Sequence, residues 1–280
     1  MQQRKIWPAP AKINLFLHIT GKRPDGYHDL QTVFQFLDYG DDLFFDLRDD
    51  GLVERVYDLG FSEEQDLCLR AAALLKPLCA SSCGVSIDLT KRLPMGGGLG
   101  GGSSNAATTL IALNELWEIG LSRTELAELG LQLGADVPVF VEGRAAWAEG
   151  VGEVLTPLKL AETWYLVLNP QINVSTAQIF SHKRLTITPQ MKKIRALEKG
   201  IDSTFGENQL ETIVRAEYPE VNALFEWLSQ HGKPRMSGSG GSVFLPLKSQ
   251  NHGLELLAKK PLSAVGFVAR GMNIHPLLLS

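Results

Sequence analysis

Apolar and polar residues alternate along the first part of the chain, which predicts β-strands. Residues 11–20, AKINLFLHIT, place Ile13, Leu15, Leu17 and Ile19 on one side of an extended segment. The next stretch, KRPDGYHDL, contains Pro-Asp-Gly and predicts a turn. Similar strand-like runs recur at residues 30–40, 41–47, 51–59 and 84–94.

Helical spacing begins in the middle of the chain. Residues 67–78 have this spacing and end near a proline. A second helix is predicted over 123–133, with Ser122 as its N-cap, and segment 133–155 predicts a turn followed by a β-hairpin. A further helix is predicted between 67–78 and 123–133. Its buried face is predicted from apolar residues four, three and four positions apart: Ala106, Leu110, Leu113 and Trp117.

The order of elements changes after about Pro157, so we expect two α+β domains, residues 1–155 and 156–280. The charged segment 190–206 is expected to be the most loop-like or mobile region. The second domain is predicted to contain strands at 163–170 and 264–272 and helices near 177–182, 218–230 and 252–260.

Composition narrows the class of protein. Of 280 residues, 44% are hydrophobic and 21% are charged, which is typical of a globular chain. The formal charge of −4 argues against a nucleic-acid surface spread over the whole molecule. No apolar run approaches the ~20 residues that span a bilayer, and the start lacks a signal-peptide cleavage pattern. The odd number of cysteines predicts reduced thiols, so we expect a cytoplasmic protein. From the charge and the lack of a long apolar run, we expect neither nucleic-acid nor membrane partners.

The stretch GGGLGGG, residues 96–102, places six glycines in seven positions between a predicted strand and a predicted helix. Because each glycine raises the entropic cost of ordering the loop, the backbone is expected to approach a partner or to point several amides at one place. A flexible linker does not suit this position. A dinucleotide-binding fold fits Gly96, Gly98 and Gly101 as GxGxxG, but its acidic residue at the end of a second strand is missing. A phosphate cradle fits better, because inward amides and the helix start near Ser103 both favour anions.

The glycine stretch, within PMGGGLGGGSSNAA, resembles the central motif of the GHMP kinase superfamily. PAKINLFL at 10–17 and SGSGGSVF at 237–244 resemble its other motifs, in the expected order. The resemblance implies a two-domain α+β fold with a ribosomal-protein-like N-terminal domain, a C-terminal ferredoxin-like domain and the active site in the cleft between them. It also implies ATP with Mg²⁺, the ATP being bound by Pro94, Met95, Gly96, Gly97, Gly98, Leu99, Gly100, Gly101, Gly102, Ser103 and Ser104.

Two further stretches, residues 12–35 and LGADVPVF at 133–140, resemble one branch of this superfamily. That resemblance implies phosphorylation of the 2-hydroxyl on the methylerythritol part of a CDP-linked substrate, in non-mevalonate isoprenoid biosynthesis. Two alternatives stay open: another GHMP kinase acting on a small alcohol such as homoserine or mevalonate, and a non-enzymatic binding module on the same fold. The sequence also leaves the oligomeric state open, and a homodimer is one option. It does not identify the ligands of the magnesium ion, for which the loop residue Ser104 is only one candidate.

Asp136 and Lys12 are the candidate catalytic residues. By itself, Asp136 suits a turn or a helix cap, and Lys12 suits the solvated edge of a strand. Their matches to the family's catalytic aspartate and to the lysine of its PAKIN motif imply a base and a cationic partner that holds it ionised. Alternation places Asn14 on the same strand face as Lys12, and Asn14 matches a substrate-contacting residue.

The resemblance implies further substrate contacts in a cytidine pocket. Tyr27 and His28, after the predicted turn, would line this pocket, and Thr176 and Phe180 would close over it. One residue departs from the family pattern, because Asp66 stands where an asparagine usually lies near the adenine. The role of that position is therefore open. Two basic residues after the strand at 84–94, Lys91 and Arg92, are expected to be solvated charges rather than ligands.

Overall fold

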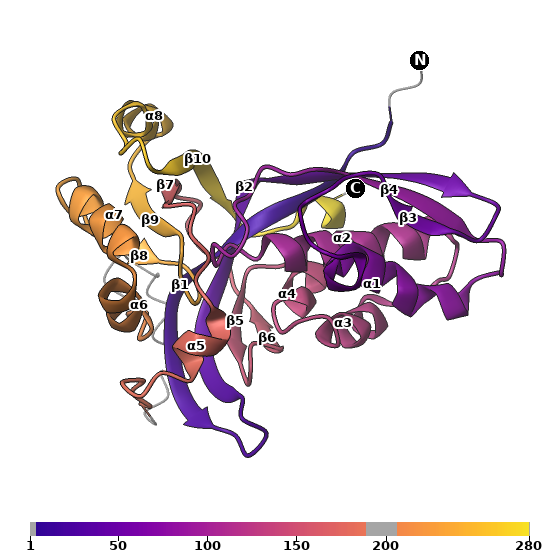
Figure 1. The fold of residues 1–280 in the computed structure, drawn as a ribbon, viewed down its shortest axis with the longest axis horizontal. Coiled ribbons are helices and arrows are strands. Elements are labelled where there is room, and N and C mark those ends of the chain that lie inside the picture. The colour runs from indigo at the N-terminus through magenta and orange to yellow at the C-terminus, as the bar shows by residue number, and fades with distance from the viewer. Residues whose placement is uncertain (1–3, 189–205, 280) are drawn as a thin grey trace.

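A long antiparallel hairpin runs through the middle of the molecule (Figure 1). It consists of β1 (Trp7–Lys22) and β2 (His28–Arg48). This computed structural model describes residues 4–188 and 206–279, so most of the segment 190–206 lies outside the described residues.

The first half of the chain builds one part of the fold around this hairpin. Its core joins side chains from strands and helices, including Trp7, Leu43, Ile87, Leu110 and Phe140. The strands added here are β3 (Val53–Arg55), β4 (Gly84–Thr90), β5 (Ala146–Glu149) and β6 (Val154–Pro157). The helices are η1 (Glu63–Gln65), α1 (Leu67–Leu75), η2 (Lys76–Leu78), α2 (Gly101–Leu116), α3 (Arg123–Leu131) and α4 (Val137–Glu142).

The second half builds the other part. Helices from this half share a core with β7 and β9 that includes Leu166, Val214, Phe225 and Leu256. Its strands are β7 (Trp164–Asn169), β8 (Arg235–Met236), β9 (Val243–Leu247) and β10 (Val265–Met272). Its helices are α5 (Thr176–Phe180), α6 (Glu211–Glu217), α7 (Pro219–Ser229), α8 (Gln250–Ala258) and η4 (Pro276–Leu278).

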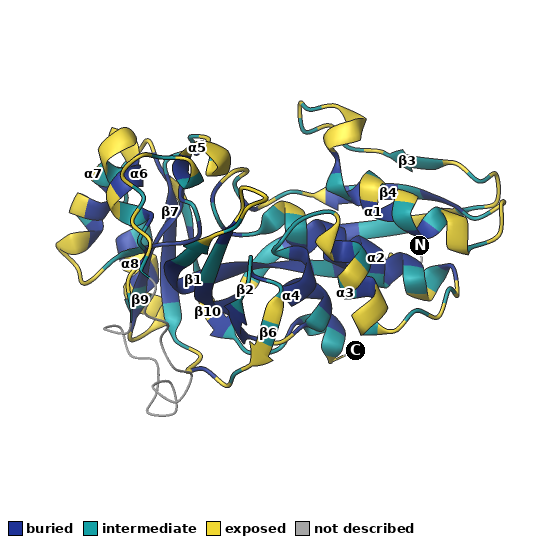
Figure 2. Cartoon of the chain, turned by 90° about the horizontal axis from the view of Figure 1, so that it is seen from below, coloured by how far each residue is buried: buried dark blue, intermediate teal, exposed yellow. Residues whose placement is uncertain are grey.

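One sheet joins the two parts, in the order β3-β4-β2-β10-β7-β9-β8, with β1, β5 and β6 off this path. The junction is short: Gly271 pairs with Leu37, and Met272 pairs with Phe36. Apolar side chains from both parts fill the space around it, among them Phe16, Trp147, Phe244 and Phe267. Figure 2 shows the resulting run of buried residues along β1 and α2, whereas α3 and α7 expose their outer faces.

The predicted boundary between residues 1–155 and 156–280 stays a prediction. After β10 the chain returns to the first part, where the Ala145 N–H donates to the Asn273 carbonyl oxygen over 2.8 Å. Leu277 of η4 then packs in the core of the first part. The end of the chain therefore contributes to the packing of both parts.

Most predicted elements are confirmed. The predicted helices at 67–78, 123–133, 218–230 and 252–260 correspond to α1 with η2, α3, α7 and α8. At α3, Ser122 and Glu125 form a capping box that satisfies two end N–H groups. The strand predicted at 51–59 is shorter than expected, because only the three residues of β3 pair with β4.

The hairpin predicted at 133–155 is partly wrong. Its first half is the helix α4, and only β5 and β6 form a hairpin. The α4 residues from Val137 to Val141 are all buried, so their hydrophobic pattern has no period that separates a helix from a strand. Pro138 in the first turn and Gly143, with φ of 70°, supply the helix start and stop that decide the structure.

The two strands predicted at 30–40 and 41–47 are one continuous strand, β2. The prediction ended the first of these strands at Gly40. Instead, Gly40 lies opposite Pro10 in the β1–β2 ladder, and a Cβ at Gly40 would overlap the Ala9 carbonyl oxygen. Glycine is required here because two backbones approach closely, and not because the chain turns.

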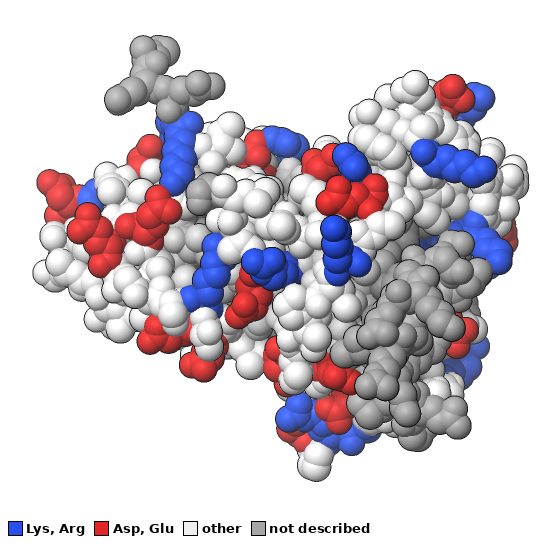
Figure 3. All heavy atoms as spheres, turned by 180° about the vertical axis from the view of Figure 1, so that it is seen from behind, with Lys and Arg blue, Asp and Glu red and all other residues white. Residues whose placement is uncertain are grey.

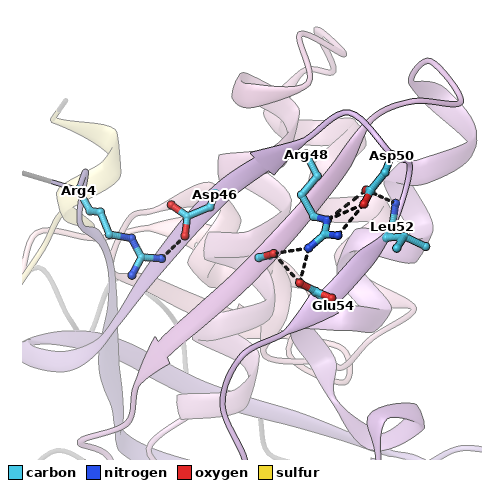
Figure 4. Close-up of polar contacts among 7 residues, drawn as sticks. Arg4, Asp46, Arg48, Asp50, Leu52 and Glu54 are labelled. Atoms are coloured by element: carbon cyan, nitrogen blue, oxygen red, sulfur yellow. Dashed lines mark hydrogen bonds and ion pairs between the residues drawn. The ribbon is translucent and has the colours of Figure 1, made fainter. Parts of the chain in front are cut away.

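Charged side chains of both signs are interspersed over the face seen in Figure 3. Among the described residues, no helix is both long and apolar enough to cross a bilayer. On the outer face of β2, Arg48 hydrogen-bonds Asp50 and contacts Glu54 of β3 (Figure 4).

Arg48→Met is expected to raise the pKa of Asp50, which the hydrogen bond from Arg48 holds at about 2, toward its ordinary value of 3.8. Because the folded-state pKa is lowered, the contribution of this pair to stability is present above about pH 4 and is lost as the pH falls toward 2. An NMR titration of the Asp50 carboxyl carbon measures the shift, with Arg4→Met as the control. A pKa that stays near 2 would instead make the Leu52 N–H, which also donates to Asp50, the main cause.

Candidate active site

The glycine loop forms a concave row of backbone amides. Gly96, Gly98 and Gly100 have φ of 65°, 72° and 70°, whereas Gly97 and Leu99 between them do not have positive φ. Such alternation of left- and right-handed residues turns successive N–H groups toward one side and makes an anion-binding nest. The glycines are thus needed for their backbone conformation, as the phosphate-cradle interpretation expects.

The loop carbonyls face the opposite way and are held by two distant segments. Ser242 N–H donates to Gly97 O over 3.0 Å, and Ser237 Oγ donates to Gly98 O over 2.8 Å. Lys12 N–H of β1 donates to Leu99 O over 2.9 Å. The strand β1 and the glycine-serine loop at residues 237–242 therefore hold the nest from its carbonyl side.

Helix α2 begins at Gly101, directly after the nest, and its first N–H groups lack partners within the helix. In its first turn, Ser104 Oγ and Asn105 Oδ1 are buried and have no hydrogen-bond partner in the described part of the chain. A buried oxygen without a partner is costly. The Ser104 hydroxyl is also a ligand type that Mg²⁺ accepts, so these residues fit a magnesium–nucleotide complex.

A cavity of about 370 Å³ lies in front of the nest. Every predicted ATP-binding residue except the buried Ser104 lines it. Additional lining residues come from the segment before α1, from α1 and α2, and from β4 and the residue that follows it: Tyr57, Leu59, Phe61, Gln65, Asp66, Leu67, Cys68, Leu89, Lys91 and Asn105.

A second cavity, of about 320 Å³, meets the first. Four residues line both cavities: Gly96, Gly98, Ser103 and Thr176. The second cavity is also lined by Lys12, Asn14, Thr32, Phe34, Asp136, Val151, Phe180 and Ser239. A ligand extending past the nest in the first cavity would thus meet a ligand in the second one.

Lys12 and Asp136 come together at the second cavity. Lys12 Nζ lies 2.9 Å from Asp136 Oδ2, although β1 and α4 carry them from distant parts of the chain. The lysine side chain is only 3% exposed, whereas that of Asp136 is 33% exposed, so the carboxylate is the more accessible of the two groups that line the cavity. Asp136 precedes α4 but makes no capping bond with its side chain, so its carboxylate is not engaged by the start of that helix.

Asn14 supports this pair on the same strand face. Its Oδ1 accepts from Lys12 Nζ over 2.7 Å, and its Nδ2 donates to Thr32 Oγ1 over 2.8 Å. Thr32 Oγ1 donates in turn to the Phe16 carbonyl oxygen over 2.5 Å. This chain of bonds fixes the orientation of the Asn14 amide and, through it, the Lys12 ammonium.

The predicted cytidine-pocket residues are only partly brought together. Thr176 and Phe180 line the second cavity, and Thr176 Oγ1 lies 2.6 Å from Ser239 Oγ. The His28 ring lies 5.6 Å from the Phe180 ring, and burial together with the charge of Lys22 holds the pKa of His28 below 6.5. Tyr27 is 63% exposed, and neither it nor His28 lines the two cavities.

The expectation that Lys91 is a solvated charge is wrong. Its side chain is 17% exposed, and its Nζ lies 2.5 Å from Oδ2 of the buried Asp41. The Nζ also borders the start of α2, 3.2 Å from where a Cβ at Gly101 would lie. Sequence reasoning missed this residue because Asp41 comes from β2, and only the pairing of β2 with β4 brings the two charges together.

Asn105 was missed for a simpler reason. It follows the predicted serines directly, inside SSNAA. Its position near the start of the predicted helix is the sequence signal that could have identified it as a site residue. Asp66, whose role was open, is the N-cap of α1 and accepts from Cys68 N–H over 2.8 Å.

Known proteins resemble this chain over nearly its whole length. Residues 66–144 match the family described as GHMP kinases N terminal domain, and residues 189–259 match GHMP kinases C terminal. The chain belongs to the GHMP kinase family. A Nitrosococcus oceani protein named 4-diphosphocytidyl-2-C-methyl-D-erythritol kinase is 53% identical to this GHMP kinase, over 98% of this chain and 96% of that protein. A Tolumonas auensis protein of the same name is 52% identical, over 98% and 95%.

Solved structures of GHMP kinases also resemble this chain. A crystal structure of 4-(cytidine 5'-diphospho)-2C-methyl-D-erythritol kinase matches this GHMP kinase with a TM-score of 0.82 and 31% identity, over 95% of this chain and 99% of that one. A Methanococcus jannaschii mevalonate kinase matches with a TM-score of 0.70 and 16% identity, over 97% and 99%, which shows the fold alone. The predicted superfamily and its two-part α+β fold are therefore confirmed, and the family uses ATP as the phosphate donor.

Gly98→Ala is expected to destabilise this GHMP kinase and weaken nucleotide binding. A Cβ at Gly98 would overlap the Ser237 carbonyl oxygen, and the left-handed conformation alone costs an L-residue about 1–2 kcal/mol. A loss of about 2–4 °C in Tm per kcal/mol is expected. The control for stability is Gly102→Ala, where the nearest atom to a new Cβ is the flexible Leu67 side chain at 3.3 Å. Equal Tm values for the two variants would contradict the role assigned to the Gly98 backbone.

Proposed function

We propose that this GHMP kinase transfers the γ-phosphoryl group of ATP to the 2-hydroxyl of 4-diphosphocytidyl-2-C-methyl-D-erythritol, a step in non-mevalonate isoprenoid precursor biosynthesis. The observation that carries the substrate is the 53% identity, over 98% of the chain, to a kinase of that name. The two adjoining cavities support the proposal, because phosphoryl transfer needs a donor and an acceptor end to end.

The cavity in front of the nest is the proposed ATP site. The amides of the nest and the start of α2 would bind the phosphates, and such fixed dipoles stabilise the transferring group without covalent chemistry. Ser104 would hold a magnesium ion, whose charge, when the ion is bound, neutralises charge developing on the phosphates. Lys91 would add a cation at the start of α2.

Asp136 is the proposed general base. As the acceptor hydroxyl oxygen forms its bond to the γ-phosphorus, the hydroxyl proton passes to the Asp136 carboxylate and ADP leaves. Lys12, 2.9 Å from that carboxylate, orients it and balances its charge, and Asn14 keeps the lysine in place.

The cytidine of the acceptor is proposed to bind beside Phe180 and His28. Their rings lie 5.6 Å apart at 41° and form an aromatic wall next to the second cavity. A neutral His28 can read the polar edge of the base, and Phe180 can stack on its face. Tyr27 would cover the base from the hairpin turn, and Thr176 would contact the part of the substrate that reaches the nest.

We propose a cytoplasmic enzyme that works on small molecules and has no nucleic-acid or membrane partner. The homodimer and the division into residues 1–155 and 156–280 also stay predictions.

Asp136→Asn is expected to lower kcat by at least ~10²-fold, because the amide cannot accept the hydroxyl proton. ATP affinity, measured by calorimetry, is expected to stay nearly unchanged, since the Asp136 side chain faces the second cavity. Asp46→Asn, on the outer face of β2, is the matched control with unchanged kcat. A parallel loss of ATP binding in Asp136→Asn would mean that Asp136 has a structural role.

A panel of alcohol acceptors tests the substrate. The cytidylated methylerythritol is expected to have a kcat/KM at least ~10-fold above that of methylerythritol phosphates without cytidine, because base stacking alone contributes about 1–3 kcal/mol. Homoserine and mevalonate are expected to be poorer still. Indifference to cytidine would favour another small-alcohol kinase, and no ATP turnover with any acceptor would favour the binding module.

A further inference from the structure

One wall of the proposed nucleotide cavity, to which the base would extend from phosphates bound at the nest, is held mostly by side-chain contacts. Residues 56–65 connect β3 to α1, and Tyr57, Leu59 and Phe61 of this segment line the cavity. The strand before it, β3, has three residues and lies at the edge of the sheet. Such a segment needs side-chain contacts to keep one shape, because an edge strand with few pairs constrains it weakly.

Arg55 supplies contacts at two points of this wall. Its Nη2 donates to the Phe61 carbonyl oxygen over 2.7 Å, and its Nη1 lies 3.1 Å from Asp66 Oδ2. The guanidinium also lies 5.4 Å from the Phe61 ring centroid. Arg55 is 10% exposed, so it fastens the middle and the end of the 56–65 wall from within the protein.

The Asp66 carboxylate has no acceptor capacity left for a ligand. Oδ1 accepts from Cys68 N–H at 2.8 Å and Leu69 N–H at 3.4 Å, and Oδ2 accepts from Tyr57 OH at 2.8 Å and from Arg55. Four donors saturate the two oxygens of a carboxylate. The side chain is 3% exposed although the residue lines the cavity.

We propose that Arg55 and Asp66 are positioning residues for the donor nucleotide, which hold the 56–65 wall against the base without contacting it. The aspartate matters because an asparagine at this position would leave the buried Arg55 without an anion. This inference rests on the proposed ATP site. It implies that the pair sets affinity for any nucleotide triphosphate equally and does not choose among bases.

Steady-state kinetics of Arg55→Met, Asp66→Asn and the double variant test the pair. Each single variant is expected to raise the KM for ATP about tenfold, the effect of losing a charged hydrogen bond, with kcat and the KM of the acceptor unchanged. The ratio of kcat/KM for ATP to that for GTP is expected to stay at its wild-type value. The double variant is expected to lose no more than Arg55→Met, because Asp66→Asn acts through its contact with Arg55 and Arg55→Met already removes that contact.

Arg48→Met is the matched control, since Arg48 also pairs with two carboxylates but on the outer face of β2 (Figure 4). If Arg55→Met does not fold, Arg55→Lys, which keeps the charge but cannot hold both Phe61 O and Asp66, gives the same readout. A changed ATP-to-GTP ratio in Asp66→Asn, or an unchanged KM for ATP in the Arg55 variants, overturns the inference. An unchanged KM for ATP in Gly98→Ala as well would instead overturn the proposed ATP site.

Discussion

Lys12 contacts two parts of the site at once, and the arrangement of the site depends on both contacts. Its backbone N–H holds the Leu99 carbonyl of the nest, and its ammonium lies 2.9 Å from the Asp136 carboxylate. The residue itself is 2% exposed on a strand that is buried on both faces. A shift of β1 would therefore move the nest and the Asp136 carboxylate together, which couples the two cavities.

The cations around the two cavities are already engaged before any phosphate arrives. Lys12 pairs with Asp136, Lys91 pairs with Asp41, and Arg55 pairs with Asp66. Each of these described cations thus has a carboxylate partner, so in the proposed ATP site most of the attraction for a triphosphate is assigned to backbone amides and the start of α2. This division of roles fits the six glycines of the loop. The groups proposed to bind belong to the backbone, and their conformation requires positive φ at three positions and leaves no room for a Cβ at Gly98.

Much of this arrangement could be predicted from the sequence, because local patterns determine it. Alternation along β1 placed Lys12 and Asn14 on one face, and their side chains do touch. The density of glycines located the nest. In contrast, the approach of Lys12 to Asp136 was expected only from the family resemblance, since no local pattern joins β1 to α4.

The parts that sequence reasoning missed depend on contacts between distant segments. At Gly40, β2 continues past the backbone of Ala9, which lies too close to admit a Cβ. The helix α4 could not be recognised from its hydrophobic pattern, because its residues from Val137 to Val141 are all buried. The pairing of Lys91 with Asp41 depends on strand register. Each of these features becomes visible only when the partner segment is known.

The place of β10 in the sheet has a consequence for folding. This strand lies between β2 and β7, which belong to different parts of the fold, and it follows both of them in the chain. Without β10, the strand edges of β2 and β7 that it covers would lack their pairing partner, and open strand edges are prone to associate with other chains. The pairing of β10 therefore joins the two parts and at the same time covers two edges, so that assembly of the fold and protection from aggregation depend on one strand.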